Sequence, residues 1–247
     1  MQPEPADAGS LRVDGNLAGL YDSYYGDAET QRWRAIGARD KADHIVELCR
    51  DLGAVDVLEV GCGDGAVLRE LSRRGFGKRL HGLEISSSGT AAVKQSNIER
   101  LVSIDTFDGY HIPFADQSID LVYATHVLEH VEHERLFLRE LTRVGRHVLI
   151  EVPFEDTLKV AKAVNNDIGH INFYNSATFR TLLAEQLEVK TFQIFDHSVE
   201  VIAFNRSRLS GRIRKILRSA SLRLAPSAAE RVFVYHAAAL CRPLPAA

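Results

Sequence analysis

A glycine-rich turn between a predicted strand and a predicted helix constrains this chain most. The apolar run at residues 55–60 is typical of a buried strand, and Gly61-Cys62-Gly63-Asp64-Gly65 follows it directly. Residues 66–74 then carry apolar side chains at helical spacing and end before Gly75. Gly61 and Gly63 let the backbone approach a ligand, and the helix start offers unpaired N–H groups. The sequence therefore predicts a ligand-binding turn at the carboxyl end of a strand.

Strands and helices alternate on both sides of this turn. Further strands are expected at residues 79–84, 101–104, 119–124 and 147–152, and helices at residues 29–52, 88–98 and 132–142. Such alternation implies right-handed crossovers and a parallel sheet with helices on both faces. We therefore predict an α/β fold: a Rossmann-like, doubly wound, mostly parallel sheet with an antiparallel edge.

The pattern changes after Pro153. Residues 176–185 predict a helix, and residues 189–195 and 231–240 are candidate strands for an antiparallel pair at the sheet edge. Residues 199–204 are also strand-like. We divide the chain into an N-terminal arm or lid (1–28), a cofactor-binding core with an acceptor-site insertion (29–205), and a basic helix with an edge strand of the same domain (206–247).

Composition narrows the cellular setting. The formal net charge of -3 gives no general attraction to nucleic acid or to an anionic membrane. No apolar run approaches the roughly 20 residues that cross a bilayer, and the N-terminus has no secretory signal. Cys49, Cys62 and Cys241 are far apart and lack zinc-ligand spacing, which fits a reducing compartment. We expect a cytoplasmic protein with no stable membrane association and no nucleic-acid partner.

Two nucleotide cofactors could use the turn. Glu84 ends the next predicted strand, about 20 residues on, where a carboxylate can accept hydrogen bonds from ribose hydroxyls. The spacing Gly61-x-Gly63-x-x-Ala66 also nearly matches the dinucleotide fingerprint of nicotinamide oxidoreductases. Asp64 argues against a dinucleotide, because its carboxylate would repel a pyrophosphate and favour the cationic sulfonium of S-adenosylmethionine. Alternatively, Asp64 only caps the helix that begins near Ala66.

Three segments make the chain similar to a known family. They are LEVGCGDG at residues 58–65, GLEIS at 82–86, and DGYHIPF at 108–114 running into DLVYATHVLEHV at 120–131. The sequence resembles the class I S-adenosylmethionine-dependent methyltransferases, closest to the type 11-like branch that acts on small molecules. The resemblance extends over about residues 21–179.

The resemblance implies a cofactor site for S-adenosyl-L-methionine, with S-adenosyl-L-homocysteine as the product. Its predicted cofactor-binding residues are Gly61, Cys62, Gly63 and Asp64 near the methionine part, Glu84 and Ile85 near the ribose, Asp108 and Gly109 at the adenine edge, Thr125 near the amino group, and Tyr24. Tyr24 lies with Tyr21 and Tyr25 in a segment that relatives fold over the cofactor. These tyrosines can equally be packing residues of an N-terminal arm.

Methyl transfer to a hydroxyl needs a base, whereas a free amine hardly does, because sulfonium is already a good leaving group. His126 is the first candidate base because it follows the fourth strand, where ligands of such folds bind. His170, in the segment GHINFY at residues 169–174, is the second and resembles a histidine of relatives. His126 can also serve only to buttress the structure, with Glu129 and His130 near the same helix face. Glu151 can orient a substrate or make an ordinary loop contact.

The predicted function is methyl transfer to a small-molecule acceptor, most simply a hydroxyl of a sugar or natural-product intermediate. The alternatives are N-methylation of a small amine, a nicotinamide-dependent oxidoreductase, and a binding module without catalysis. His126, Glu129, His170 and Asp167 are conceivable metal ligands, but their spacing matches no known motif, so no metal is predicted. The expected partners are the acceptor and, in a homodimer, a second copy of the chain.

The predicted methyl transfer assigns no role to a basic segment near the C-terminus. Its cations are Arg206, Arg208, Arg212, Arg214, Lys215, Arg218 and Arg223. They can form a surface for an anionic partner. They can also lie on the solvent-exposed face of an amphipathic helix at residues 210–224. The apolar face of that helix would then pack on the core through Ile213, Ile216, Leu217 and Leu222. We favour the second interpretation.

Overall fold

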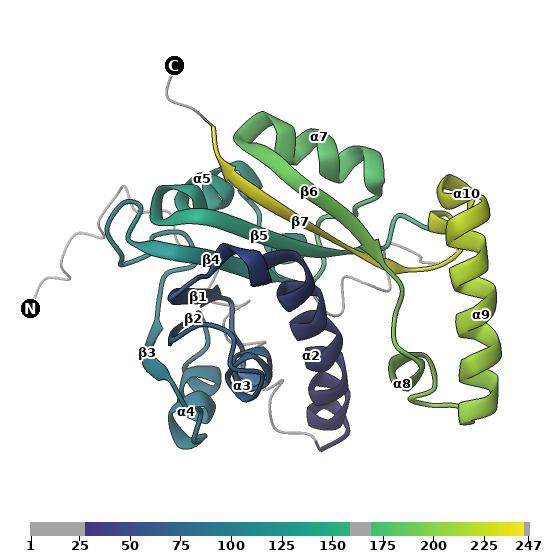
Figure 1. Cartoon of the computed structure of the whole chain (residues 1–247), viewed down its shortest axis with the longest axis horizontal. Coiled ribbons are helices and arrows are strands. Elements are labelled where there is room, and N and C mark those ends of the chain that lie inside the picture. The colour runs from purple at the N-terminus through teal and green to yellow at the C-terminus, as the bar shows by residue number, and fades with distance from the viewer. Residues whose placement is uncertain (1–27, 159–168, 245–247) are drawn as a thin grey trace, which may run out of the picture.

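One seven-stranded sheet organises the protein, and the computed structural model describes residues 28–158 and 169–244. The strand order is β3-β2-β1-β4-β5-β7-β6 (Figure 1). The strands are β1 (Asp56–Val60), β2 (Arg79–Glu84), β3 (Leu101–Thr106), β4 (Ile119–Thr125), β5 (Gly145–Phe154), β6 (Leu187–Phe195) and β7 (Tyr235–Pro243). Neighbours among β1 to β5 pair in parallel, and β7 runs antiparallel to both β5 and β6. This arrangement confirms the predicted mostly parallel sheet with an antiparallel edge.

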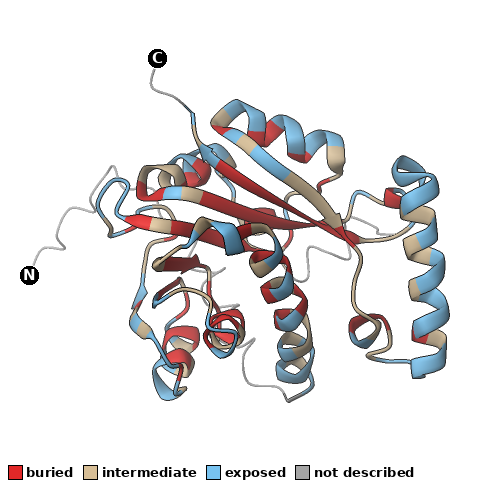
Figure 2. Cartoon of the chain, viewed as in Figure 1, coloured by how far each residue is buried: buried red, intermediate tan, exposed pale blue. Residues whose placement is uncertain are grey.

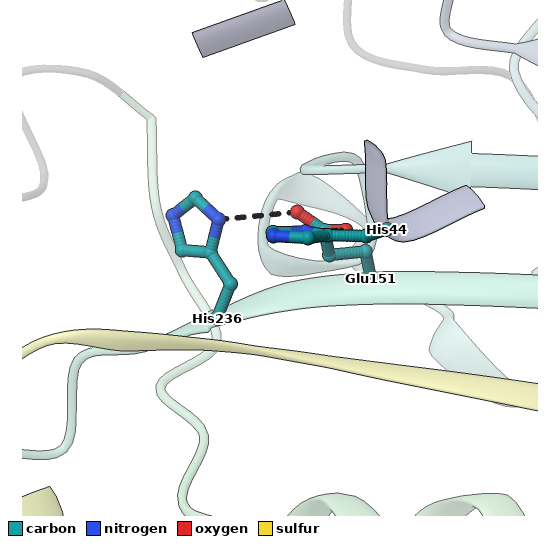
Figure 3. A group of neighbouring side chains, drawn as sticks. All are labelled: His44, Glu151 and His236. Carbon is teal, nitrogen blue, oxygen red and sulfur yellow. Dashed lines mark hydrogen bonds and ion pairs between the residues drawn. The ribbon is translucent and has the colours of Figure 1, made fainter. Parts of the chain in front are cut away.

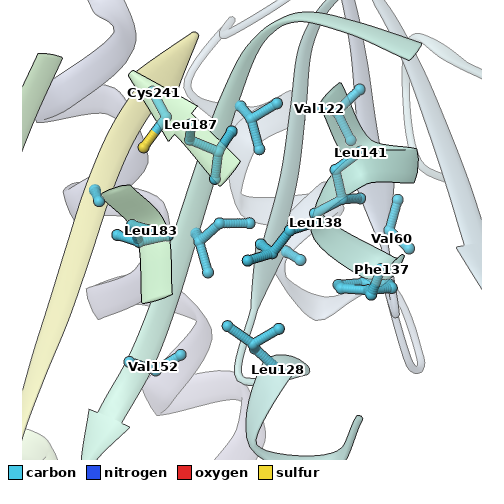
Figure 4. Close-up of a cluster of buried hydrophobic side chains, with 14 of the residues drawn as sticks. Val60, Val122, Leu128, Phe137, Leu138, Leu141, Val152, Leu183, Leu187 and Cys241 are labelled. Atoms are coloured by element: carbon cyan, nitrogen blue, oxygen red, sulfur yellow. The ribbon is translucent and has the colours of Figure 1, made fainter. Parts of the chain in front are cut away.

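Helices cover both faces of the sheet, as predicted. On one face α2 (Ala28–Cys49), α3 (Ala66–Arg73) and α4 (Ser87–Gln95) contribute to an apolar cluster with the strands. On the other face α5 (Glu134–Val144) and α7 (Ser176–Gln186) pack over β4, β5 and β7. Figure 4 shows this second cluster, and Figure 2 shows the central strands almost entirely buried. Short 3-10 helices occupy Arg50–Leu52 and Leu128–His130.

Two predicted strands near the C-terminus needed correction. Residues 199–204 begin with the helix α8 (Val199–Ile202), because Oγ of Ser198 accepts a hydrogen bond from the Val201 N–H at 3.2 Å and caps a helical turn. A strand-like run of apolar residues needs a neighbouring strand to pair with, and β6 already forms this edge of the sheet. The strand expected from residue 231 begins only at Tyr235, after the helix α10 (Pro226–Glu230) and a turn.

The basic helix is α9 (Arg208–Leu224), and its apolar side faces the opposite way from our expectation. Ile213, Ile216 and Leu217 are 52–68% exposed, so the expectation that they pack on the core was wrong; Leu222 is only half-buried. The docked side of α9 carries two cations, Lys215 and Arg218. Nε of Arg218 lies 2.6 Å from Asp196, a buried acid just after β6, and Lys215 Nζ lies 3.3 Å from the same carboxylate. In Figure 2 most of α9 is exposed.

Among the helices of residues 28–158 and 169–244, none combines the length and the apolar character needed to cross a membrane.

Candidate active site

The glycine turn after β1 is held against β2 by backbone hydrogen bonds. Gly61 and Cys62 donate to the carbonyl of Leu83 at 2.8 and 3.0 Å. Gly61 has a φ of 78°, and a Cβ atom at this position would lie 2.5 Å from Cγ2 of Val127. Only glycine fits here, because both the backbone angle and the space exclude a side chain. The turn is therefore rigid, and its N–H groups are placed by the sheet itself.

Glu84 ends β2 and binds the same turn. Its Oε2 accepts a hydrogen bond from the Gly63 N–H at 2.7 Å, and its Oε1 accepts one from the Ser86 N–H at 3.1 Å. The side chain is buried, and burial raises the pKa of this carboxyl although the backbone donors oppose the rise. Glu84, which the sequence predicted to lie beside the glycine turn, is thus fixed at the carboxyl edge of the sheet.

A cavity of about 920 Å³ opens at this edge, where ligands of open α/β sheets bind. Most of the predicted site residues line it: Gly61, Cys62, Gly63, Glu84, Ile85, Gly109, Thr125, His126 and His170. Two others do not contribute to its wall among the described residues, namely Asp64 and Asp108. Tyr24, with Tyr21 and Tyr25, lies outside the described residues, as does Asp167.

Asp64 lies beside the start of α3 and faces Arg34. Its Oδ1 accepts hydrogen bonds from the Ala66 N–H at 3.1 Å and from Nη2 of Arg34 at 3.0 Å. The N-cap residue of α3 is Gly65, so Asp64 contacts the first turn from one position before the cap. The ion pair with Arg34 offsets the negative charge of Asp64. The role of Asp64 beside a cofactor stays a prediction.

Asp108 closes the turn that carries Gly109 into the cavity wall. Its Oδ1 accepts hydrogen bonds from the N–H groups of Tyr110 and His111 at 2.9 and 2.7 Å. Phe107 and Tyr110 line the cavity on either side of this turn. The side chain of Asp108 therefore shapes an aromatic part of the wall.

His126 lies between two fully buried carboxylates. Its Nδ1 is 3.5 Å from Oε1 of Glu129, and its Nε2 is 3.4 Å from Oε1 of Glu151. Burial lowers the pKa of the imidazole well below its usual value, more strongly than Glu151 raises it. The residue also adopts a φ of 58°, in the left-handed region that is costly for a non-glycine residue. Such strain is typical of functional sites.

His170 is paired with an acid that the sequence analysis did not single out. Its Nδ1 lies 2.6 Å from Oε2 of Glu155. Burial tends to lower the pKa of His170, but the hydrogen bond that it donates to Glu155 and the charges of Glu129 and Glu155 raise it overall. His130, whose ring centroid is 4.6 Å away, has its pKa lowered to about 4 by burial.

The backbone explains why two predicted segments meet here. The N–H groups of Ile171 and Asn172 donate to the carbonyl of Glu129 at 2.9 and 3.0 Å. The amide of Asn172 also donates to the carbonyls of Leu128 and Val131. The segment GHINFY is therefore tied to the segment that contains His126, and both line one cavity.

Other polar groups of the cavity wall were missed from the sequence. They are Lys41, Glu59, Glu155, His197 and His236. Burial raises the pKa of Glu59 to about 8 and that of the neighbouring Glu129 to about 7. His44 lies just behind the wall, 2.9 Å from Glu151. A usable signal was present: His44 interrupts the apolar face of α2, and His236 interrupts the apolar run of β7.

Known proteins resemble this chain in both sequence and fold. Residues 58–147 match the family model described as a methyltransferase domain. Ajmaline N-methyltransferase from Rauvolfia serpentina is 32% identical over 96 residues, which cover 36% of this chain and 32% of that protein. Probable tocopherol O-methyltransferase from Oryza sativa subsp. japonica is 28% identical over 167 residues, covering 60% and 46%. The chain thus spans less than half the length of these relatives.

The fold comparison extends over nearly the whole chain. The crystal structure of geranyl diphosphate C-methyltransferase from Streptomyces coelicolor A3(2), in complex with S-adenosyl-L-homocysteine, superposes with a TM-score of 0.62 at 14% identity and covers 93% of this chain and 97% of that one. The glycine turn and Glu84 thus occur on the fold that the sequence motifs predicted. Residues 58–147 thus match a methyltransferase domain, and the chain has the fold of a solved methyltransferase.

Proposed function

We propose that the protein transfers the methyl group of S-adenosyl-L-methionine to a hydroxyl of a small-molecule acceptor. The named relatives act as N-, O- and C-methyltransferases, so the acceptor atom must be argued from this chain's own residues. The observation that carries the proposal is a single cavity lined by both the turn bound to Glu84 and the imidazole of His170, itself paired with Glu155. The groups proposed to bind the cofactor and to accept the proton therefore line the same cavity.

The cofactor is assigned to the turn side of the cavity. Gly61, Cys62 and Gly63 would contact its methionine part, and Glu84 would accept hydrogen bonds from the ribose hydroxyls with its remaining lone pairs. Ile85, Gly109 and Thr125 complete this part of the wall. Asp64 and Asp108 act here as positioning residues, because one accepts a hydrogen bond from the first N–H of α3 and the other closes the turn of Gly109.

His170 is assigned as the base. Its Nδ1–H donates to Glu155, which leaves Nε2 free to accept the proton of an acceptor hydroxyl. The paired carboxylate makes the imidazole a stronger base, whereas the buried His126 is a weak one. In the proposed step the acceptor oxygen attacks the methyl carbon, the carbon–sulfur bond breaks, and S-adenosyl-L-homocysteine leaves as the proton passes to His170.

An apolar groove of about 750 Å³ adjoins the cavity and suits the body of the acceptor. The two spaces share Trp33, His197 and Val201 in their walls. The exposed apolar side of α9 supplies Leu209, Ile213 and Leu217 to the groove. We therefore propose an acceptor whose hydroxyl reaches the cavity while a largely apolar part lies along α9.

A product screen tests the proposal. The full chain is incubated with S-adenosyl-L-methionine and matched apolar alcohols and amines, and methylated products are identified by mass spectrometry. We expect methyl ethers, accompanied by S-adenosyl-L-homocysteine in equal amount. Methylated amines as the only products, at a rate unchanged in His170→Ala, would contradict O-methylation and the assigned base.

A further inference from the structure

Three potential metal ligands from distant parts of the chain meet at the cavity wall, where His236 lines the cavity. His44 comes from α2, Glu151 from β5 and His236 from β7 (Figure 3). Nδ1 of His44 lies 2.9 Å from Oε2 of Glu151, and Nδ1 of His236 lies 3.1 Å from Oε1. The three ligand atoms all lie within 4.8 Å of one another. The proposed methyl transfer uses none of these residues.

The cluster is buried and incompletely satisfied. Glu151 is fully buried, and His44 and His236 are 6% and 8% exposed. Oε1 of Glu151, Nδ1 of His236 and Nε2 of His126 lack a well-oriented hydrogen-bond partner among the described residues. Leaving a buried polar atom without a partner is costly, and more so when the atom is charged. Native proteins rarely retain several such atoms at one point unless something binds them.

Two more imidazoles lie beside the cluster. The ring centroids of His126 and His197 each lie 4.3 Å from that of His236. The cluster is therefore rich in the nitrogen ligands that transition-metal ions bind.

We propose that His44, Glu151 and His236 bind a divalent transition-metal ion. Two imidazole nitrogens with one carboxylate oxygen suit Zn²⁺, Fe²⁺ or Co²⁺, whereas Mg²⁺ and Ca²⁺ prefer oxygen ligands alone. Ligands at about 2.1 Å from a tetrahedral ion are about 3.4 Å apart, close to the separations of the Glu151 oxygens from their histidine partners. Phe195 stacks on the ring of His44 at 3.8 Å and holds its orientation.

The ion would have room for a further ligand on the cavity side. His236 lines the cavity, and three protein ligands leave at least one position open in a four-coordinate ion. Nε2 of His126, 3.4 Å from Oε1 of Glu151, is near enough to take that position when no acceptor is bound. An acceptor oxygen bound there would be a stronger acid. This last consequence rests on the proposed function, whereas ion binding does not.

Metal binding is tested on the full chain after removal of metals by chelation. Co²⁺ is titrated while its visible ligand-field absorption is recorded, and Zn²⁺ is then added as a competitor. We expect about one Co²⁺ per chain. Glu151→Gln and His236→Gln should each weaken binding by more than about 100-fold, since outer-shell changes alone cost 10–100-fold. The control His81→Gln, at a buried histidine paired with Ser103 on β3, should bind Co²⁺ normally.

Several results would overturn the proposal. One is the absence of stoichiometric Co²⁺ or Zn²⁺ binding by the wild-type chain. Another is loss of binding in Glu129→Gln with normal binding in Glu151→Gln, because Glu129, His130 and His170 form a separate potential ligand group. If the ligand variants fail to fold, X-ray absorption of the wild-type Co²⁺ form decides, since a spectrum without imidazole scattering excludes the site.

A parallel titration of the metal-free chain with S-adenosyl-L-homocysteine separates the two proposals. Cofactor binding without metal binding would refute only the proposed metal site. Metal binding without cofactor binding would instead refute the proposed methyl transfer.

Discussion

Gly63 donates its backbone N–H to Oε2 of Glu84 at 2.7 Å, and this bond joins the glycine turn after β1 to the acid that ends β2. The two residues are 21 positions apart in the chain and meet because β1 and β2 pair in parallel. The bond leaves other lone pairs of the carboxylate for a ligand. Rigid backbone donors and a buried acid thus meet at one point of the cavity wall.

Replacing Glu84 should weaken cofactor binding. Glu84→Ala is expected to lower the affinity for S-adenosyl-L-homocysteine by about 1–3 kcal/mol, because hydrogen bonds to a charged acceptor are lost. Glu84→Gln should lie between Ala and the wild type, since its amide oxygen still accepts. Calorimetric titration measures both variants, with Asp105→Ala, an exposed acid on β3, as the control. Equal affinities of the wild type and the three variants for S-adenosyl-L-homocysteine would show that Glu84 does not bind the ribose.

A methyl group at Gly61 should destabilise the fold. In Gly61→Ala the backbone must keep a φ of 78° while the new Cβ meets Val127 at 2.5 Å. We expect a loss of about 1–3 kcal/mol in the free energy of unfolding, measured by urea denaturation. Gly37→Ala is the matched control, because nothing lies within 4 Å of its Cβ position in the interior of α2. That change should be neutral or slightly stabilising. The same loss in both variants would refute the steric account.

His170→Ala should lower the turnover of a hydroxyl acceptor about 10²–10⁴-fold while cofactor affinity is nearly unchanged. Single-turnover kinetics with a matched alcohol measures the loss. His111→Ala is the control, because that side chain is 74% exposed. A larger loss in His126→Ala than in His170→Ala would transfer the role of base to His126.

The pH profile provides a separate check on the pair of His170 and Glu155. The base must be neutral, and the paired carboxylate raises its pKa, so kcat/KM should fall as the pH is lowered through a midpoint above 6.5. Glu155→Gln removes that charge and lowers the pKa of His170, although Glu129 and His130 remain nearby. The ascending limb should therefore move to lower pH. An unmoved limb would show that another group titrates.

The exposed apolar side of α9 should affect the acceptor and not the fold. Ile213→Ser and Leu217→Ser remove apolar lining from the groove, so KM for an apolar acceptor should rise several-fold. The binding free energy lost is about 25 cal/mol for each Å² of apolar contact that is removed. Ile216→Ser changes a residue of the same helix that is 68% exposed and is not among the groove residues. An equal rise in KM for all three variants would point to a general effect on α9.

The parts of the fold predicted from sequence are those in which local pattern and burial agree. Strands β1, β4 and β5 are rich in buried apolar residues because helices cover both faces, so their runs stand out. An amphipathic pattern, in contrast, defines two faces without saying which one docks. In α9 the docked face is set by Asp196, a buried acid before α8 that binds Arg218 and Lys215. No local feature of α9 contains that information.

The candidate site divides in the same way. His126 and His170 were predicted because they belong to short segments with a recognisable composition. His44 and His236 were missed because each lies alone in an apolar stretch, and only the packing of α2 and β7 around β5 brings them to Glu151. Asp64 shows what a local motif leaves out. Its chemistry suits a cationic ligand, and only the fold reveals that Arg34, 30 residues away, pairs with it.

Calorimetric titration of the full chain with S-adenosyl-L-homocysteine and, separately, with NAD tests the central claim most directly. The account predicts one molecule of S-adenosyl-L-homocysteine bound per chain and no heat of binding with NAD. Binding of NAD without binding of S-adenosyl-L-homocysteine would contradict it.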